Sequence, residues 1–244
     1  MIVIATDFGC EGPYIGQMKA VLAREAPGVP VIDLFANLPA FEIQAAAYLL
    51  AAYVEVFEPG TVFLGIVDPG VGGARRAAAV CADGRWLVGP DNGLFNVVAQ
   101  RAMELRWWDI DWRPPQMSHS FHGRDLFAPV AARLARGDTV PGRAVAPAAR
   151  LLEGWPPELS KIVYVDHYGN LMTGIRAAGV PDHAILEAGA LQLRRALTFS
   201  AVQPGEAFWY ANANGLVEIA VNQGRASALL GLAVGDRVHF HGRL

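Results

Sequence analysis

The segment GTVFLGIVDPGVGGARR, residues 60–76, begins as an apolar strand and ends in an acid, a glycine-rich turn and two arginines. A short apolar run bounded by turn residues is typical of a strand buried inside a sheet. The glycines suggest a phosphate-binding loop, but no Gly-Lys-Ser/Thr follows them, so that interpretation is weak. The segment therefore predicts a buried strand whose end presents Asp68 and Arg75.

The flanking sequence alternates between strand and helix patterns. This βαβα order is typical of an α/β fold with a mainly parallel sheet covered by helices. An Asp83-Gly84 turn separates two of the strands. Further strands are predicted at 2–6, 29–35, 77–83 and 85–91, and helices at 13–27, 41–57, 92–101 and 124–137.

The second half of the chain has a different character. Prolines and small residues dominate 137–157, which predicts a linker at about 146–157. We expect an N-terminal α/β sandwich domain over 1–145 and a smaller C-terminal antiparallel β-barrel domain over 158–244. Its strands are predicted at 161–166, 184–189, 191–199, 207–212, 216–221 and 236–242, with a helix only near 225–231.

Composition excludes several classes of protein. The chain has 244 residues and a net charge of −3 without a basic run, so neither nucleic acid nor an anionic membrane is an expected partner. Two cysteines, Cys10 and Cys81, are too few for a metal site alone, and a reducing cytoplasm is the simplest compartment. The start lacks the pattern of a signal peptide, and Glu55 interrupts the longest apolar run, which predicts a buried helix and not a membrane span.

Polar clusters follow several of the predicted strands or precede helices. Functional side chains gather at the carboxyl ends of strands in an open α/β sheet. Predicted strands end at or just before Asp7, Asp68 and Asp91. Predicted helices begin at the motifs GPDN and SFHGRD. Each cluster has another interpretation: Asp7 and Asp91 suit helix caps or turns, and His122 suits a structural histidine. A metal site from Asp7, Asp68, His122 and Asp125 has no recognised ligand spacing, so no metal is predicted.

The motifs in these clusters and their order resemble those of a known protein family, from Ile4 to Gly235. TDFG, GPYIGQMKAVL, VDPGVGG, GPDNGLF, SFHGRDLFAPVAA, YGNL and NGLVEIAVN occur in this order. The chain resembles the S-adenosyl-L-methionine (SAM) hydroxide adenosyltransferases, which are related to the fluorinase and chlorinase. The resemblance implies a homotrimer without a cofactor. It also implies that SAM binds between the N-terminal domain of one subunit and the C-terminal domain of its neighbour.

The resemblance implies that water attacks C5′ of SAM and yields adenosine and methionine. Asp68, Arg75 and His122 would form the water-activating group, with either Asp68 or His122 accepting the proton. A structural ion-pair network is the alternative for these three residues. The fluorinase carries tyrosine at the position of Asp68 and serine at that of Gly123. A carboxylate repels a halide, which favours hydrolysis over 5′-halogenation.

The resemblance also assigns the substrate-binding residues. Asp7 would bind the ribose hydroxyls, and Asp166 would bind the methionine ammonium. Asn170 would read the adenine edge, together with backbone near Asn222 and Gly224. Aromatic candidates around the adenosine are Tyr168, Phe199 and Tyr210, for which core packing is the alternative, and Phe41, which stands where the halogenases carry tryptophan.

Three positions depart from the family pattern. Gly12 replaces a common aspartate, Ala213, followed by Asn214, replaces a usual serine, and Tyr168 replaces a phenylalanine. The first two lie toward the amino-acid end of the substrate. How the methionine moiety is held is therefore open, and so is a SAM- or adenosine-binding module with little turnover.

Overall fold

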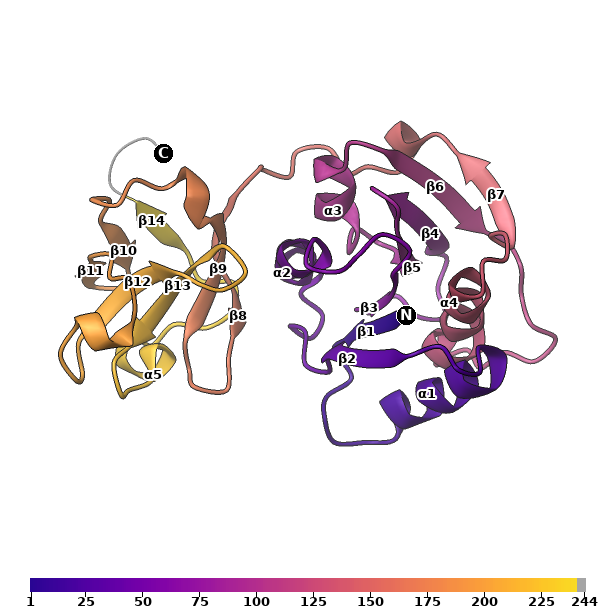
Figure 1. The fold of residues 1–244 in the computed structure, drawn as a ribbon, viewed down its shortest axis with the longest axis horizontal. Coiled ribbons are helices and arrows are strands. Elements are labelled where there is room, and N and C mark those ends of the chain that lie inside the picture. Colours follow the sequence, from indigo (N-terminus) through magenta and orange to yellow (C-terminus); the bar gives the residue numbers. More distant parts are fainter. Residues whose placement is uncertain (241–244) are drawn as a thin grey trace. The chain divides into compact units, whose positions relative to one another are not determined.

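The structure, a computed structural model, describes residues 1–240 (Figure 1). The chain divides into two units, Met1–Gly154 and a second unit that begins at Trp155. This boundary falls inside the segment 146–157 that carries several prolines. Residues 241–244, which include the end of the strand predicted at 236–242, lie outside the described residues.

A seven-stranded sheet in the order β2-β1-β3-β5-β4-β6-β7 runs through the first unit. The β2-β1-β3-β5 half is parallel, as the strand–helix alternation predicts. The other half is antiparallel, so the expectation of a mainly parallel sheet does not hold there. The cause is local: Asp83 and Gly84, both with positive φ, turn β4 directly back into β5. The strands are β1 (Ile2–Thr6), β2 (Val31–Phe35), β3 (Val62–Ile66), β4 (Arg76–Ala82), β5 (Arg85–Asp91), β6 (Leu105–Ile110) and β7 (Gly142–Val145).

Helices cover both faces of this sheet. α1 packs against α4, and α2 packs against α3, with the two pairs on opposite faces (Figure 1). Every residue of β1 and β3 is buried, which follows from the cover on both sides. The helices are α1 (Tyr14–Glu25), α2 (Ile43–Val54), α3 (Asn96–Arg101) and α4 (Ala128–Ala135).

The helix predicted at 124–137 has a composite start. It opens with a π-helical turn over Gly123–Phe127, whose Gly123 carbonyl accepts a hydrogen bond from the Ala128 amide. α4 then continues with Pro129 in its first turn, where a missing N–H is tolerated. His122 immediately precedes this turn, so the turn's geometry sets its position.

The second unit consists of two small antiparallel sheets. β12-β13-β9-β8 forms one sheet and β11-β10-β14 the other. Isolated bridges pair Lys161 of β8 with Arg237 and Trp209 of β12 with Arg195. Closure into a barrel stays a prediction. The elements are β8 (Leu159–Val165), β9 (Leu171–Arg176), β10 (Leu186–Ala188), β11 (Leu191–Leu193), β12 (Ala207–Ala211), β13 (Leu216–Val221), α5 (Ala226–Leu230) and β14 (Val238–Phe240).

Trp209 anchors the core of the second unit. Its ring is completely buried, and its indole N–H donates a 3.1 Å hydrogen bond to the Ala184 carbonyl oxygen. This bond satisfies the one polar atom of the side chain, so the ring can fill the core without an unpaired donor. Within residues 1–240, none of the helices has the length and apolar character needed to cross a bilayer.

Candidate active site

Asp68, Arg75 and His122 are in direct contact at the carboxyl end of β3. Arg75 Nε lies 2.9 Å from Asp68 Oδ1 and 3.1 Å from Oδ2, and Arg75 Nη2 also donates to Oδ2. The same Nη2 lies 2.9 Å from His122 Nδ1. The side chains of Asp68 and Arg75 are only 6% and 12% exposed, so water screens this ion pair weakly.

The contact with Arg75 fixes the tautomer of His122. An arginine nitrogen only donates hydrogen bonds, so His122 Nδ1 must accept and the ring hydrogen must reside on Nε2. A protonated ring would direct an Nδ1–H at the guanidinium. Burial, and then the Arg75 cation, lower the pKa of His122 below its ordinary value. Geometry and charge both keep this histidine neutral.

The cluster borders a cavity of about 390 Å³ in the first unit. Asp7, directly after β1, lies in the same lining as Asp68 and His122. Burial raises the pKa of Asp7, and a 3.5 Å hydrogen bond from the Phe41 amide opposes that shift. The complete lining is Asp7, Phe8, Tyr14, Ala40, Phe41, Ile66, Asp68, Val71, Ser120, Phe121, His122 and Gly123.

Aromatic rings form part of the cavity wall. Phe8, Tyr14 and Phe121 lie mutually edge-on or tilted, with centroids 5.4–5.9 Å apart. Phe41 is different, because its side chain is 74% exposed and its φ is +65°, a conformation uncommon for a residue with a Cβ. Phe8, Tyr14 and Phe121 were not predicted from the sequence. Their positions within the polar motifs TDFG, GPYIG and SFHGRD could have identified them.

Asp91 lies outside this lining and has a different partner. Its Oδ2 is 3.6 Å from Arg150 Nε, while Arg150 also holds Asp109 through two hydrogen bonds. Neither Asp7 nor Asp91 caps a helix, because α1 and α3 begin after Pro13 and Phe95. Among the described residues, no three His, Cys, Asp or Glu side chains come together as a metal site requires.

The second unit has its own cavity of about 680 Å³. It is lined by seven of the residues predicted to bind substrate: Asp166, Tyr168, Asn170, Phe199, Tyr210, Ala213 and Asn214. Asn222, the remaining predicted substrate-binding residue of this unit, lies outside that lining. Its side-chain amide donates a 2.8 Å hydrogen bond to the Val202 carbonyl oxygen, while the neighbouring Gly224 does line the cavity.

Asn170 presents an unpaired acceptor in this lining. Its backbone N–H and its Nδ2 both donate to the Asp166 carboxylate, at 2.8 and 3.0 Å. Its Oδ1 is buried and has no hydrogen-bond partner among residues 1–240. An unpaired buried acceptor is destabilising unless a ligand supplies a donor. A ligand N–H that reached this oxygen would satisfy it.

Glu218 is a site residue that the sequence reasoning missed. It lies on β13, is 2% exposed, and lines the cavity of the second unit. Its carboxylate accepts hydrogen bonds from Tyr210 Oη at 2.6 Å and Asn212 Nδ2 at 2.8 Å. Burial raises its pKa, and these two bonds oppose the shift. The sequence did contain an indication of this residue, because an acid within the apolar segment LVEIAV is costly to bury without a partner.

Comparisons with known proteins agree with this picture. Residues 2–142 match the family described as SAM hydroxide adenosyltransferase N-terminal domain, and residues 160–239 match its C-terminal domain. The chain is 39% identical to the (R)-S-adenosyl-L-methionine hydrolase of Salinispora tropica, over 97% of this chain and 96% of that protein. It is 24% identical to a fluorinase of Actinoplanes sp., over 91% of each.

A solved structure shares the fold of this chain. The crystal structure of an uncharacterized conserved protein from Thermotoga maritima matches with a TM-score of 0.88 and 32% identity, over 98% of this chain and 99% of that one. Together, the two matched domains span nearly the whole sequence. The chain belongs to the SAM hydroxide adenosyltransferase family.

Proposed function

We propose that this protein hydrolyses SAM at C5′ to adenosine and L-methionine. The observation that carries the proposal is the Asp68–Arg75–His122 cluster on the wall of the first cavity, where a carboxylate, a cation and a neutral imidazole meet. Similarity to proteins named (R)-S-adenosyl-L-methionine hydrolase supports it. No cofactor enters the reaction, since the substrate already carries an activated leaving group.

The reaction requires an oriented oxygen nucleophile more than it requires an acid. The oxygen of water bonds to C5′ as the C5′–S bond breaks, and the bonding electrons pass to sulfur. The sulfonium leaves as a neutral thioether, so no proton is needed there. The water releases one proton, which an adjacent base must accept. Holding that water in line with the C5′–S bond supplies much of the rate enhancement.

Asp68 is the proton acceptor in this proposal. His122 cannot accept at Nδ1 without losing Arg75, and its Nε2 already carries the ring hydrogen. His122 therefore donates from Nε2 and orients the nucleophile. Arg75 keeps the Asp68 carboxylate in place through the paired hydrogen bonds of its Nε and Nη2. The contact between Arg75 and His122 Nδ1 is the observation that favours Asp68 over His122 as the proton acceptor.

The remaining predicted residues bind the substrate. Asp7 accepts hydrogen bonds from the ribose hydroxyls, and the free Oδ1 of Asn170 accepts one from the adenine amine. Asp166 and Glu218 give the second cavity two carboxylates for the methionine ammonium. In this proposal Glu218 contributes to holding the amino-acid end, where Gly12 and Ala213 depart from the family pattern. Aromatic contacts come from Phe41, Tyr168, Phe199 and Tyr210, beside Ala213, Asn214, Gly123 and the backbone near Asn222.

The homotrimer with sites at subunit interfaces is part of the proposal. The nucleophile group lies in one unit and the adenine- and ammonium-binding groups in the other, so a complete site needs both kinds of surface. Phe41 and Tyr168 are 74% and 71% exposed, and in the proposed trimer a neighbouring subunit would cover them. We also infer a cytoplasmic enzyme, since Cys10 and Cys81 are both free thiols.

One experiment separates this function from its two alternatives. Purified protein is incubated with SAM in oxygen-18 water, with and without chloride, and the nucleosides are resolved by chromatography and mass. Adenosine with oxygen-18 in its 5′-hydroxyl, together with methionine, is the expected result. A 5′-chloro nucleoside would assign the protein to halogenation. Tight adenosine binding without any turnover would assign it to the binding modules.

A further inference from the structure

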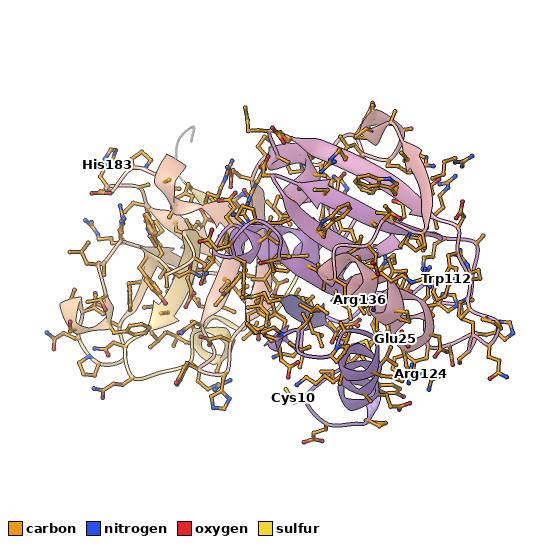
Figure 2. All side chains as sticks on the ribbon, turned by 45° about the vertical axis from the view of Figure 1, so that its right-hand side comes forward. Cys10, Glu25, Trp112, Arg124, Arg136 and His183 are labelled. Carbon is orange, nitrogen blue, oxygen red and sulfur yellow. The ribbon has the colours of Figure 1, made fainter. Side chains whose placement is uncertain are left out.

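The word SFHGRD contains an arginine and an aspartate that hydrolysis at C5′ does not use. Arg124 and Asp125 follow the catalytic His122 by two and three positions, yet neither lines the first cavity. Arg124 lies on the side of the first unit where α1 and α4 pack (Figure 2). Its side chain is one-third exposed, and that of Asp125 is 14% exposed.

These two side chains tie three segments together. Arg124 Nε lies 2.6 Å from Asp125 Oδ1, and its Nη2 lies 3.0 Å from Oδ2. Arg124 Nη1 donates a 2.9 Å hydrogen bond to Gln17 Oε1 on α1. Asp125 Oδ2 also accepts a 2.8 Å hydrogen bond from the Ser118 amide. The pair therefore connects the π-helical turn, α1 and the loop at 118–121.

The loop at 118–121 forms one wall of the first cavity and leads directly into His122. Ser120 and Phe121 line the cavity, and the Arg124 guanidinium stacks over the Phe121 ring at 5.0 Å. On its other side the loop meets the glycine-rich turn. A Cβ at Gly72 would lie 2.6 Å from the His119 carbonyl oxygen, closer than real Cβ atoms come. The loop is thus held between Gly72 and Asp125.

The π-helical turn links the position of the 118–121 loop to that of His122. This wide turn is uncommon and occurs mostly at functional sites. It places His122 at its first edge, and it has the hydrogen bond from Ala128 to Gly123 across its own backbone. The Arg124–Asp125 ion pair joins two neighbouring side chains of this turn, outside the lining of the first cavity. The Arg124 hydrogen bonds also lower the pKa of Asp125, so the pair stays ionised near neutral pH.

We propose that Arg124 and Asp125 are positioning residues that hold the 118–121 loop and His122 against Arg75, and so determine the turnover rate of the site without touching the substrate. The inference rests on the proposed function for its kinetic test. It has a separate structural test, because the His122 Nδ1–Arg75 contact exists whether or not SAM is hydrolysed.

The kinetic test compares Asp125→Asn and Asp125→Ala with a matched control. Asn keeps an acceptor for the Ser118 amide and loses the ion pair, whereas Ala loses both. We expect kcat to fall about tenfold for Asn and about a hundredfold for Ala, with KM for SAM nearly unchanged, since small displacements of a catalytic group cost this much. Asp138→Asn is the control. It breaks a similar ion pair, Arg136–Asp138, which touches neither the 118–121 loop nor the glycine-rich turn, and it should retain wild-type kcat.

The structural test is an NMR measurement of the imidazole nitrogens of His122. The wild type and Asp138→Asn should show the Nε2–H tautomer, and Asp125→Ala should show a mixture of tautomers or a raised pKa for His122. An unchanged kcat and an unchanged His122 spectrum in Asp125→Ala would overturn the inference. If the wild type makes no adenosine, the proposed function fails, and the NMR result still decides the positioning role.

Discussion

Arg75 Nη2 lies between Asp68 Oδ2 and His122 Nδ1, donating one of its two hydrogens to each. Arg75 is 7 positions from Asp68 and 47 positions from His122 in the sequence, so this single nitrogen joins residues from distant segments. It places the negative charge on Asp68 and leaves the imidazole neutral. The proposed roles of Asp68 as proton acceptor and His122 as hydrogen-bond donor rest on that arrangement.

Removal of the carboxylate at Asp68 should abolish turnover and retain binding. Asp68→Ala is expected to lower kcat by about a hundredfold to ten-thousandfold, because positioned general bases contribute about that much. Adenosine affinity should stay close to the wild-type value when measured by calorimetry. Asp33→Ala, which breaks the exposed Lys19–Asp33 pair, is the control. Adenosine formation at the wild-type rate by Asp68→Ala would show that Asp68 is not the base.

Activity should decline as pH falls through the folded pKa of His122. That pKa is lowered from its ordinary value near 6.5 by burial and by Arg75, so the decline should begin below that value. The folded state binds this proton less readily than the unfolded state, so stability should also fall as pH drops below about 6.5. Thermal unfolding of the wild type and His122→Asn between pH 8 and pH 5 measures this effect.

The sign of that stability change is a sharp criterion. In His122→Asn the contribution of this titration is gone, so the variant should lose less stability than the wild type as pH falls. Identical pH dependence of the two melting curves would contradict a neutral, shielded imidazole.

Gly123 should not tolerate a side chain. A Cβ at this position would lie 3.0 Å from Ile66 Cδ1 and 3.2 Å from Met18 Sδ, both in the core. Gly123→Ala is expected to destabilise the protein by about 1–3 kcal/mol, the usual effect of overpacking. Gly16→Ala is the matched control, because nothing lies within 4 Å of its Cβ and helices favour alanine. Denaturant unfolding that ranks Gly123→Ala as stable as Gly16→Ala would refute the packing argument.

Asn170 should discriminate adenosine from inosine. Its free Oδ1 can accept from the amine of adenine, whereas hypoxanthine presents an oxygen at the same position. We expect the wild type to bind adenosine at least about tenfold tighter than inosine, as a lost hydrogen bond to a buried group implies. Asn170→Ala should weaken adenosine binding and reduce the preference. Equal preference in variant and wild type would move adenine recognition elsewhere.

Several features of the fold could be predicted from local sequence. The all-apolar strands at 2–6 and 62–66, the Asp83-Gly84 hairpin and the β-rich second half follow from periodicity and turn chemistry. The strands β6, β7 and β9 were not predicted. LRWWDI mixes charged and aromatic residues, and only its pairing with β4 and β7 makes it a strand.

The same division applies to the sites. The sequence brought out Asp68 and Arg75 after a predicted strand and His122 at the start of a predicted helix, and a resemblance grouped them. An acid within LVEIAV hinted at Glu218, but its hydrogen bonds to Tyr210 and Asn212 and the unpaired Oδ1 of Asn170 became visible only in the folded chain. The assignment of backbone near Asn222 to the adenine stays a prediction, while the Asn222 side chain donates to the Val202 carbonyl oxygen.

The sequence by itself determined the family, the strand ends that carry the acids, and the residue types available for chemistry. These are properties of neighbours along the chain, where periodicity, turn residues and motif order are visible. Only the tertiary structure decided which nitrogen of His122 carries the hydrogen, which acceptor of Asn170 is unpaired, and which segments Arg124 and Asp125 connect. Proton position, burial and hydrogen-bond satisfaction depend on partners that folding brings from distant parts of the chain.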